Sequence, residues 1–176
     1  MKFPSILALL LIAVTALGAQ GGLQSPNDIV RLFYESLKNP LPDLSRDLDR
    51  LSPFLSVHLS GLLEQARTAD ALYSTKFPTD VPPFGHGTCV FYGGGDCDFS
   101  SYSVLAVNRH GATVQATVEL LLKDGNRPSQ PPYRWLNTVM LKTERGRWVI
   151  DDIKYFDGGA SDTLGEIVKN AEGLGN

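Results

Sequence analysis

The spacing of apolar residues changes once along this chain, and no other feature constrains the fold as strongly. In the first half, apolar side chains recur every three or four positions, which is the period of an α-helix. Beyond a boundary near residue 87 they alternate with polar side chains, which is the period of a β-strand. A helical half followed by an extended half predicts an α+β fold.

Three helices are predicted before the boundary, at about residues 25–39, 41–51 and 52–73. The first and the third begin at Ser25 and Ser52, which are both capping residues followed by proline. The prolines and glycines between residues 76 and 87 then indicate a connecting loop.

Two β-hairpins are predicted after the boundary. The clearest strand contains Val114, Ala116, Val118 and Leu120 in alternation with polar residues, which indicates one apolar and one partly solvated face. A short helix closes the chain. The expected strands span about residues 102–108, 113–122, 133–143 and 147–155, and the helix about residues 161–172.

Residues 1–19 have the features of a secretory signal peptide. Lys2 precedes an apolar run from residue 6 to residue 14, small residues follow, and cleavage is expected between Ala19 and Gln20. The run is shorter than the roughly 20 residues that a bilayer-spanning helix needs. We therefore expect a secreted or periplasmic protein without a membrane anchor after cleavage, with residues 20–176 forming one domain.

Charge and histidine placement argue against several functions. Cleavage removes one of the 16 basic residues and none of the 19 acidic ones, so the mature net charge is 15 − 19 = −4. Without a run of Lys or Arg, nucleic acid and anionic lipid are not expected partners. His58, His86 and His110 lack metal-ligand spacing, so we expect neither a metal site nor a cofactor.

Cys89 and Cys97 are the only cysteines, and Gly93, Gly94 and Gly95 lie between them. In an exported chain, an even number of cysteines predicts a disulfide, and the glycines allow the chain to reverse. A catalytic pair of Cys89 or Cys97 with His86 is the alternative that this compartment disfavours.

The element order and the segment Gly-Arg-Trp-Val-Ile-Asp-Asp-Ile-Lys-Tyr at residues 146–155 resemble the nuclear-transport-factor-2-like superfamily. With Phe33-Tyr34 and the signal peptide, the chain is similar to secreted bacterial proteins of the domain-of-unknown-function 3828 type. The resemblance implies N-terminal helices packed in the concave face of a curved antiparallel sheet, in a cone with a pocket at its mouth. Isomerases, dehydratases, polyketide cyclases, assembly modules and inhibitor or immunity proteins share that fold, so the fold leaves the chemistry open.

Asp151 and Asp152 are the candidate acid–base residues. Adjacent strand residues point to opposite faces, so one of the two is expected to face the interior. If Asp151 shares the face of Val149 and Ile153, apolar surroundings would raise its pKa. The structural alternative is an ion pair with Arg31, Arg134 or Lys154, or a hydrogen bond to a loop amide.

Large amphipathic rings and one arginine are the candidates for lining a pocket, although core packing is their default role. They are Tyr34, Tyr102, Arg134, Trp135 and Trp148. We expect an exported, non-catalytic domain that binds a small molecule or a protein partner, with an inhibitor or immunity protein as one version. The alternative is an isomerase or lyase with Asp151 or Asp152 as the base and Tyr34 or Tyr102 stabilising an oxyanion. A homodimer formed through the sheet is a further hypothesis.

Overall fold

The computed structural model describes residues 24–38, 44–82, 84, 90–91, 99–123, 131–156 and 163–172. The helices are α1 (Pro26–Lys38), α2 (Leu44–Leu51), the 3₁₀ turn η1 (Ser52–Phe54), α3 (Val57–Lys76) and α4 (Leu164–Glu172). The strands are β1 (Ser101–His110), β2 (Thr113–Leu122), β3 (Tyr133–Glu144) and β4 (Arg147–Phe156).

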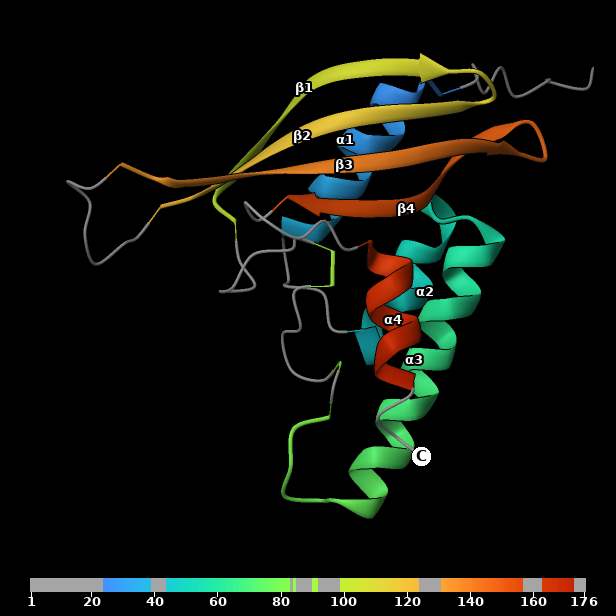
Figure 1. Ribbon diagram of the computed structural model, residues 1–176, viewed down its shortest axis with the longest axis vertical. Helices are drawn as coiled ribbons and strands as arrows, with labels where there is room; N and C mark the ends of the chain where they lie inside the picture. Colours follow the sequence, from blue (N-terminus) through green and yellow to red (C-terminus); the bar gives the residue numbers. More distant parts are fainter. Residues whose placement is uncertain are drawn as a thin grey trace, which may run out of the picture.

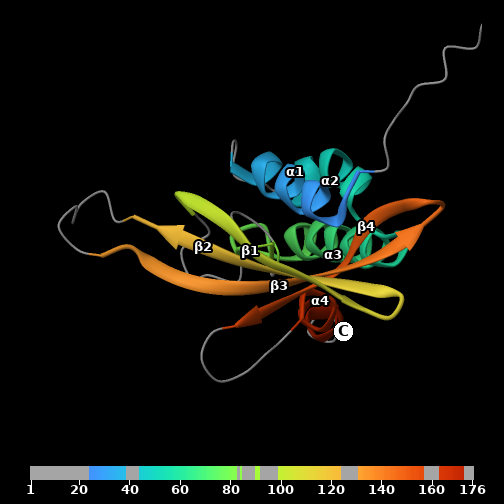
Figure 2. The same ribbon diagram turned by 90° about the horizontal axis from the view of Figure 1, so that it is seen from above.

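The four strands form one antiparallel sheet in the order β1-β2-β3-β4 (Figure 1). Helix α1 lies across one face of this sheet, which we call the inner face, while α3 and α4 pack against each other beyond β4 (Figures 1 and 2). The predicted α+β class and the short C-terminal helix are confirmed. The sheet is open between its edge strands β1 and β4, and the cone shape stays a prediction.

The inner face of the sheet carries the core, as the alternation in β2 predicts. Val114, Ala116, Val118 and Leu120 are buried, and they join one apolar cluster with residues of α1 and α3, such as Phe33 and Leu59. Burial of these side chains on both layers is the main force that holds the helices on the sheet.

The predicted capping of α1 at Ser25 is confirmed. The backbone amide of Asp28 donates to Ser25 Oγ at 3.2 Å, and the Ser25 amide donates to Asp28 Oδ2 at 3.1 Å. This reciprocal pair satisfies amides that a helix start otherwise leaves without partners.

The predicted start of the third helix at Ser52 is wrong. Ser52 begins only the single turn η1, and Leu55 then forms a parallel bridge with Ile150 of β4. The N-cap of α3 is Ser56, four residues after the predicted Ser52. Ser56 Oγ accepts a hydrogen bond from the Leu59 amide at 3.0 Å. Pairing with β4 holds Leu55 in an extended conformation, which a helix starting at Ser52 cannot contain.

Two β-bulges interrupt the sheet. The pairing of β1 with β2 skips Leu105, and the pairing of β4 with β3 skips Asp151. A bulge adds an unpaired residue and breaks the strict alternation of side chains. The rule that placed Asp151 and Asp152 on opposite faces therefore does not hold at this point of β4.

Among the helices that the structure describes, none has both the length and the apolar composition needed to cross a bilayer.

Candidate functional site

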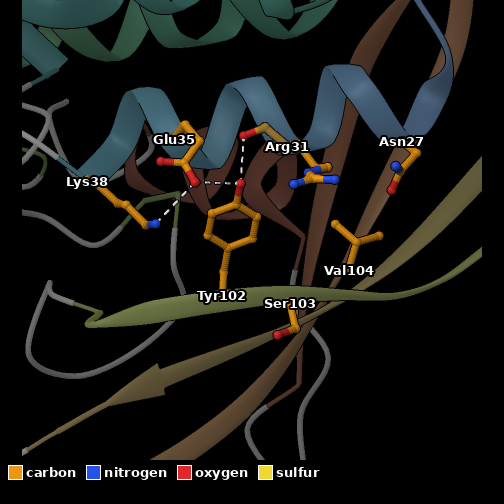
Figure 3. A pocket seen from close by; sticks show the side chains of 7 residues that line it. All are labelled: Asn27, Arg31, Glu35, Lys38, Tyr102, Ser103 and Val104. Atoms are coloured by element: carbon orange, nitrogen blue, oxygen red, sulfur yellow. Dashed lines mark hydrogen bonds and ion pairs between the residues drawn. The ribbon is translucent and has the colours of Figure 1, made fainter.

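A pocket of about 440 Å³ lies between α1 and β1 (Figure 3). Ligand pockets of proteins commonly have volumes of this order. Its lining comes from one helix and from the start of one edge strand: Asn27, Arg31, Glu35, Lys38, Tyr102, Ser103 and Val104.

The helix side of the pocket follows from the periodicity of α1. Asn27, Arg31, Glu35 and Lys38 are spaced by four, four and three residues, so they form one polar stripe beside the buried stripe. Their regular spacing is the signal that could have identified a polar wall.

The strand side of the pocket begins with Tyr102, whose ring stands between β1 and α1 (Figure 3). Its hydroxyl donates toward two acceptors, Glu35 Oε1 at 2.9 Å and the carbonyl oxygen of Arg31 at 3.1 Å. The ammonium of Lys38 lies 3.1 Å from Glu35 Oε1 and 4.9 Å from the centre of the Tyr102 ring. This network fixes the position of the ring at one end of the pocket.

The same network shifts the pKa values of two side chains. Hydrogen bonds from Lys38 and from Tyr102 hold the pKa of Glu35 below its usual value. Burial and the hydrogen bond to Glu35 raise the pKa of Tyr102, so its hydroxyl remains protonated and donates at neutral pH.

Tyr34 is buried directly behind the pocket. Its ring stacks on that of Tyr102, with centroids 5.5 Å apart and planes at 27°. Asn137 Nδ2 of β3 donates to the Tyr34 hydroxyl at 3.4 Å, and burial raises the pKa of Tyr34. Tyr34 thus supports the pocket from the core, while Tyr102 lines it.

The guanidinium of Arg31 lies between Tyr102 and the side chains of Asn27 and Val104 (Figure 3). Within the described part of the chain it makes no ion pair, although its charge acts on Asp28, Glu35 and Tyr102. A guanidinium has five N–H donors, so most of them remain available to a ligand in the pocket.

Asp151 lies outside this pocket, at the bulge of β4. Its Oδ1 is 2.7 Å from the ammonium of Lys142. Burial opposes ionisation of Asp151, but the bonds from Lys142 and Ser56 outweigh burial, and its pKa is lowered. The conditional expectation of a raised pKa is therefore wrong, because an ion pair with Lys142, a partner that sequence analysis did not name, replaces the apolar surround.

Asp152 connects β4 to α4. Its Oδ1 accepts from the amide of Gly165 at 3.0 Å and from that of Ile153 at 2.8 Å. A Cβ on Gly165 would lie 3.2 Å from Asp152 Oδ2, so the close approach favours glycine there.

The remaining candidates lie elsewhere on the sheet. Arg134 is exposed on the outer face and pairs with Glu119 at 3.4 Å. Trp135 is buried on the inner face, 5.5 Å from the ring of Tyr133, and Trp148 is half-buried against the core. Of the five predicted lining residues, the pocket between α1 and β1 includes Tyr102.

The predicted Cys89–Cys97 disulfide and His86 lie outside the described residues. Where the structure does describe the chain, no three His, Cys, Asp or Glu side chains gather into a group that could hold a metal ion.

Comparison with models of known protein families gives no match to this chain, and comparison with curated proteins gives none. The inference of function therefore depends on the geometry described above.

Proposed function

We propose that this protein is an exported, non-catalytic domain that binds a small molecule in the pocket between α1 and β1. The observation that carries the proposal is the pocket itself, in which the guanidinium of Arg31 offers hydrogen-bond donors beside about 440 Å³ of space.

Binding without catalysis is favoured by where the acidic candidates lie. Neither Asp151 nor Asp152 lines this pocket; Asp151 forms an ion pair with Lys142, and Asp152 accepts a hydrogen bond from the Gly165 amide. A general base must reach its substrate and compete for the substrate's proton. Asp151, with its lowered pKa and its bond to Lys142, is a weak base for that task.

Export is the second part of the proposal, and the apolar run after Lys2 supports it. Mass spectrometry of the protein purified from an exporting host should give an N-terminus at Gln20. A thiol assay of the same protein should find no free thiol if Cys89 and Cys97 are joined. An intact N-terminus at Met1 would contradict export.

The binding function can be tested by screening a library of polar small molecules by NMR. We expect hits to shift amide resonances of α1 and β1, and we expect Asn27→Trp, which places a large ring in the pocket wall, to abolish the shifts. Asn108→Trp is the matched control, because Asn108 is exposed on β1 outside the pocket.

Two results would contradict the proposal. One is a folded protein that binds nothing in the library, and the other is a hit that binds Asn27→Trp as tightly as the unaltered chain. Recovery of the bound molecule unchanged supports binding alone, whereas its conversion would favour the isomerase or lyase alternative.

A further inference from the structure

The pocket between α1 and β1 has a polar lining, which points to a polar ligand. Six of its seven lining residues have polar or charged side chains, and Val104 is the exception. The Ser103 side chain points away from α1 in Figure 3, so that residue lines the pocket through its backbone. A hydroxylated molecule can exchange hydrogen bonds with such walls, whereas a mainly apolar molecule would leave them without partners.

The charges of the lining are not balanced. Lys38 and Glu35 neutralise each other in an ion pair of 3.1 Å, which leaves the positive charge of Arg31. The carboxylate of Asp28 acts on Arg31 through space, but it is bonded to Ser25 and does not line the pocket. The lining residues thus carry one net positive charge, on a chain whose overall net charge is −3.

The donors near Arg31 suit an oxyanion. A guanidinium offers N–H groups in a planar fork that matches a carboxylate or phosphate in a two-point contact. The Asn27 side chain approaches the same part of the pocket in Figure 3, and its amide can donate another hydrogen bond.

We propose that this pocket selects small hydroxylated molecules that carry one oxyanion, a carboxylate or a phosphate, which Arg31 binds. The inference rests on the proposed binding function and adds the chemical class of the ligand. Arg31 is exposed, so salt screens the contact, and affinity should fall as ionic strength rises.

Three probes of similar size test this selectivity by calorimetry at low salt: glucose 6-phosphate, gluconate and uncharged glucose. We expect at least one of the two anions to bind about tenfold or more tightly than glucose. The tighter of the two identifies the oxyanion. Arg31→Gln should remove this preference, and Arg31→Lys, which keeps the charge without the fork, should retain part of it.

Arg134→Gln is the matched control, since it removes the same charge from the exposed outer face, where Arg134 pairs with Glu119. We expect it to leave anion binding unchanged. The inference is overturned if glucose binds as tightly as both anions, if Arg31→Gln leaves the preference intact, or if none of the three probes binds. A library hit that shifts α1 and β1 resonances would still support the proposed function in each of these cases, whereas the absence of any hit would contradict both.

Discussion

The guanidinium of Arg109 lies 5.6 Å from the centre of the Trp148 ring, although the two residues are on the opposite edge strands β1 and β4. Three strand spacings of about 4.8 Å separate such strands in a flat sheet. Both residues project from the inner face. Curvature of the sheet toward α1 brings the two edge strands closer on this face and so favours the contact.

This cation–π contact should be measurable as an energetic coupling between the edge strands. We expect a double-mutant cycle of Arg109→Met and Trp148→Leu, measured by urea unfolding, to give a coupling of about 0.5–1 kcal/mol. The control cycle pairs Arg134→Met with Trp148→Leu, because Arg134 lies on the other face. Equal couplings in the two cycles would show that Arg109 has no specific contact with Trp148.

Stability should depend on pH through Asp151. Its pKa in the folded protein is lowered, so ionised Asp151 stabilises the fold above the ordinary aspartate pKa of about 3.9. That contribution is lost as the pH falls through the lower, folded-state value. In urea unfolding, Asp151→Asn should therefore be destabilising at pH 7 and progressively less so below about pH 4.

The size of this effect is limited by solvent. The side chains of Asp151 and Lys142 are 34% and 31% exposed, so we expect a loss of less than about 1 kcal/mol at pH 7. Asp49→Asn is the control, because that side chain is 89% exposed. If the free energy of unfolding of Asp151→Asn changes with pH in parallel with that of the unaltered protein, the lowered pKa of Asp151 is refuted.

Two glycines should respond to alanine with opposite signs. Gly146 has φ of +77° in the turn between β3 and β4, where a Cβ is strained, so Gly146→Ala should destabilise by about 1 kcal/mol. Gly61 lies exposed inside α3, with open space where a Cβ would project, so Gly61→Ala should stabilise by about 0.5–1 kcal/mol. Melting temperatures measure both, and a shared sign would contradict the two backbone conformations.

The sequence predicts the element order well because burial imposes a period on each element. The alternation from Val114 to Leu120 identifies β2, and Ser25 identifies the start of α1. The start of α3 is harder to predict because Ser52 and Ser56 are both good caps. The choice between them depends on the bridge from Leu55 to Ile150, which is about 95 residues distant and leaves no local pattern.

The candidate site is harder to predict than the fold. Tyr102 is among the lining residues named from the sequence and lines the pocket between α1 and β1, whereas Arg31 is named only as an ion-pair partner for Asp151. The bulge at Asp151 and its pairing with Lys142 depend on the register between β3 and β4, which cannot be predicted from the sequence of either strand alone. The sequence shows which residues are aromatic, but it does not show which distant elements come into contact.

The start of α3 gives a direct comparison of two serines. Ser56 is fully buried, its Oγ caps the Leu59 amide at 3.0 Å, and its own amide donates to Ile150 at 2.8 Å. Removing a serine cap destabilises a helix by about 1 kcal/mol, so we expect that loss for Ser56→Ala in urea unfolding. Ser52→Ala removes only a bond of 3.0 Å to the Asp49 carbonyl at the surface and should lose less than about 0.5 kcal/mol. Faster hydrogen exchange at the Leu59 amide should accompany the Ser56 substitution alone, and a larger loss from Ser52→Ala would place the cap of this helix at Ser52 instead.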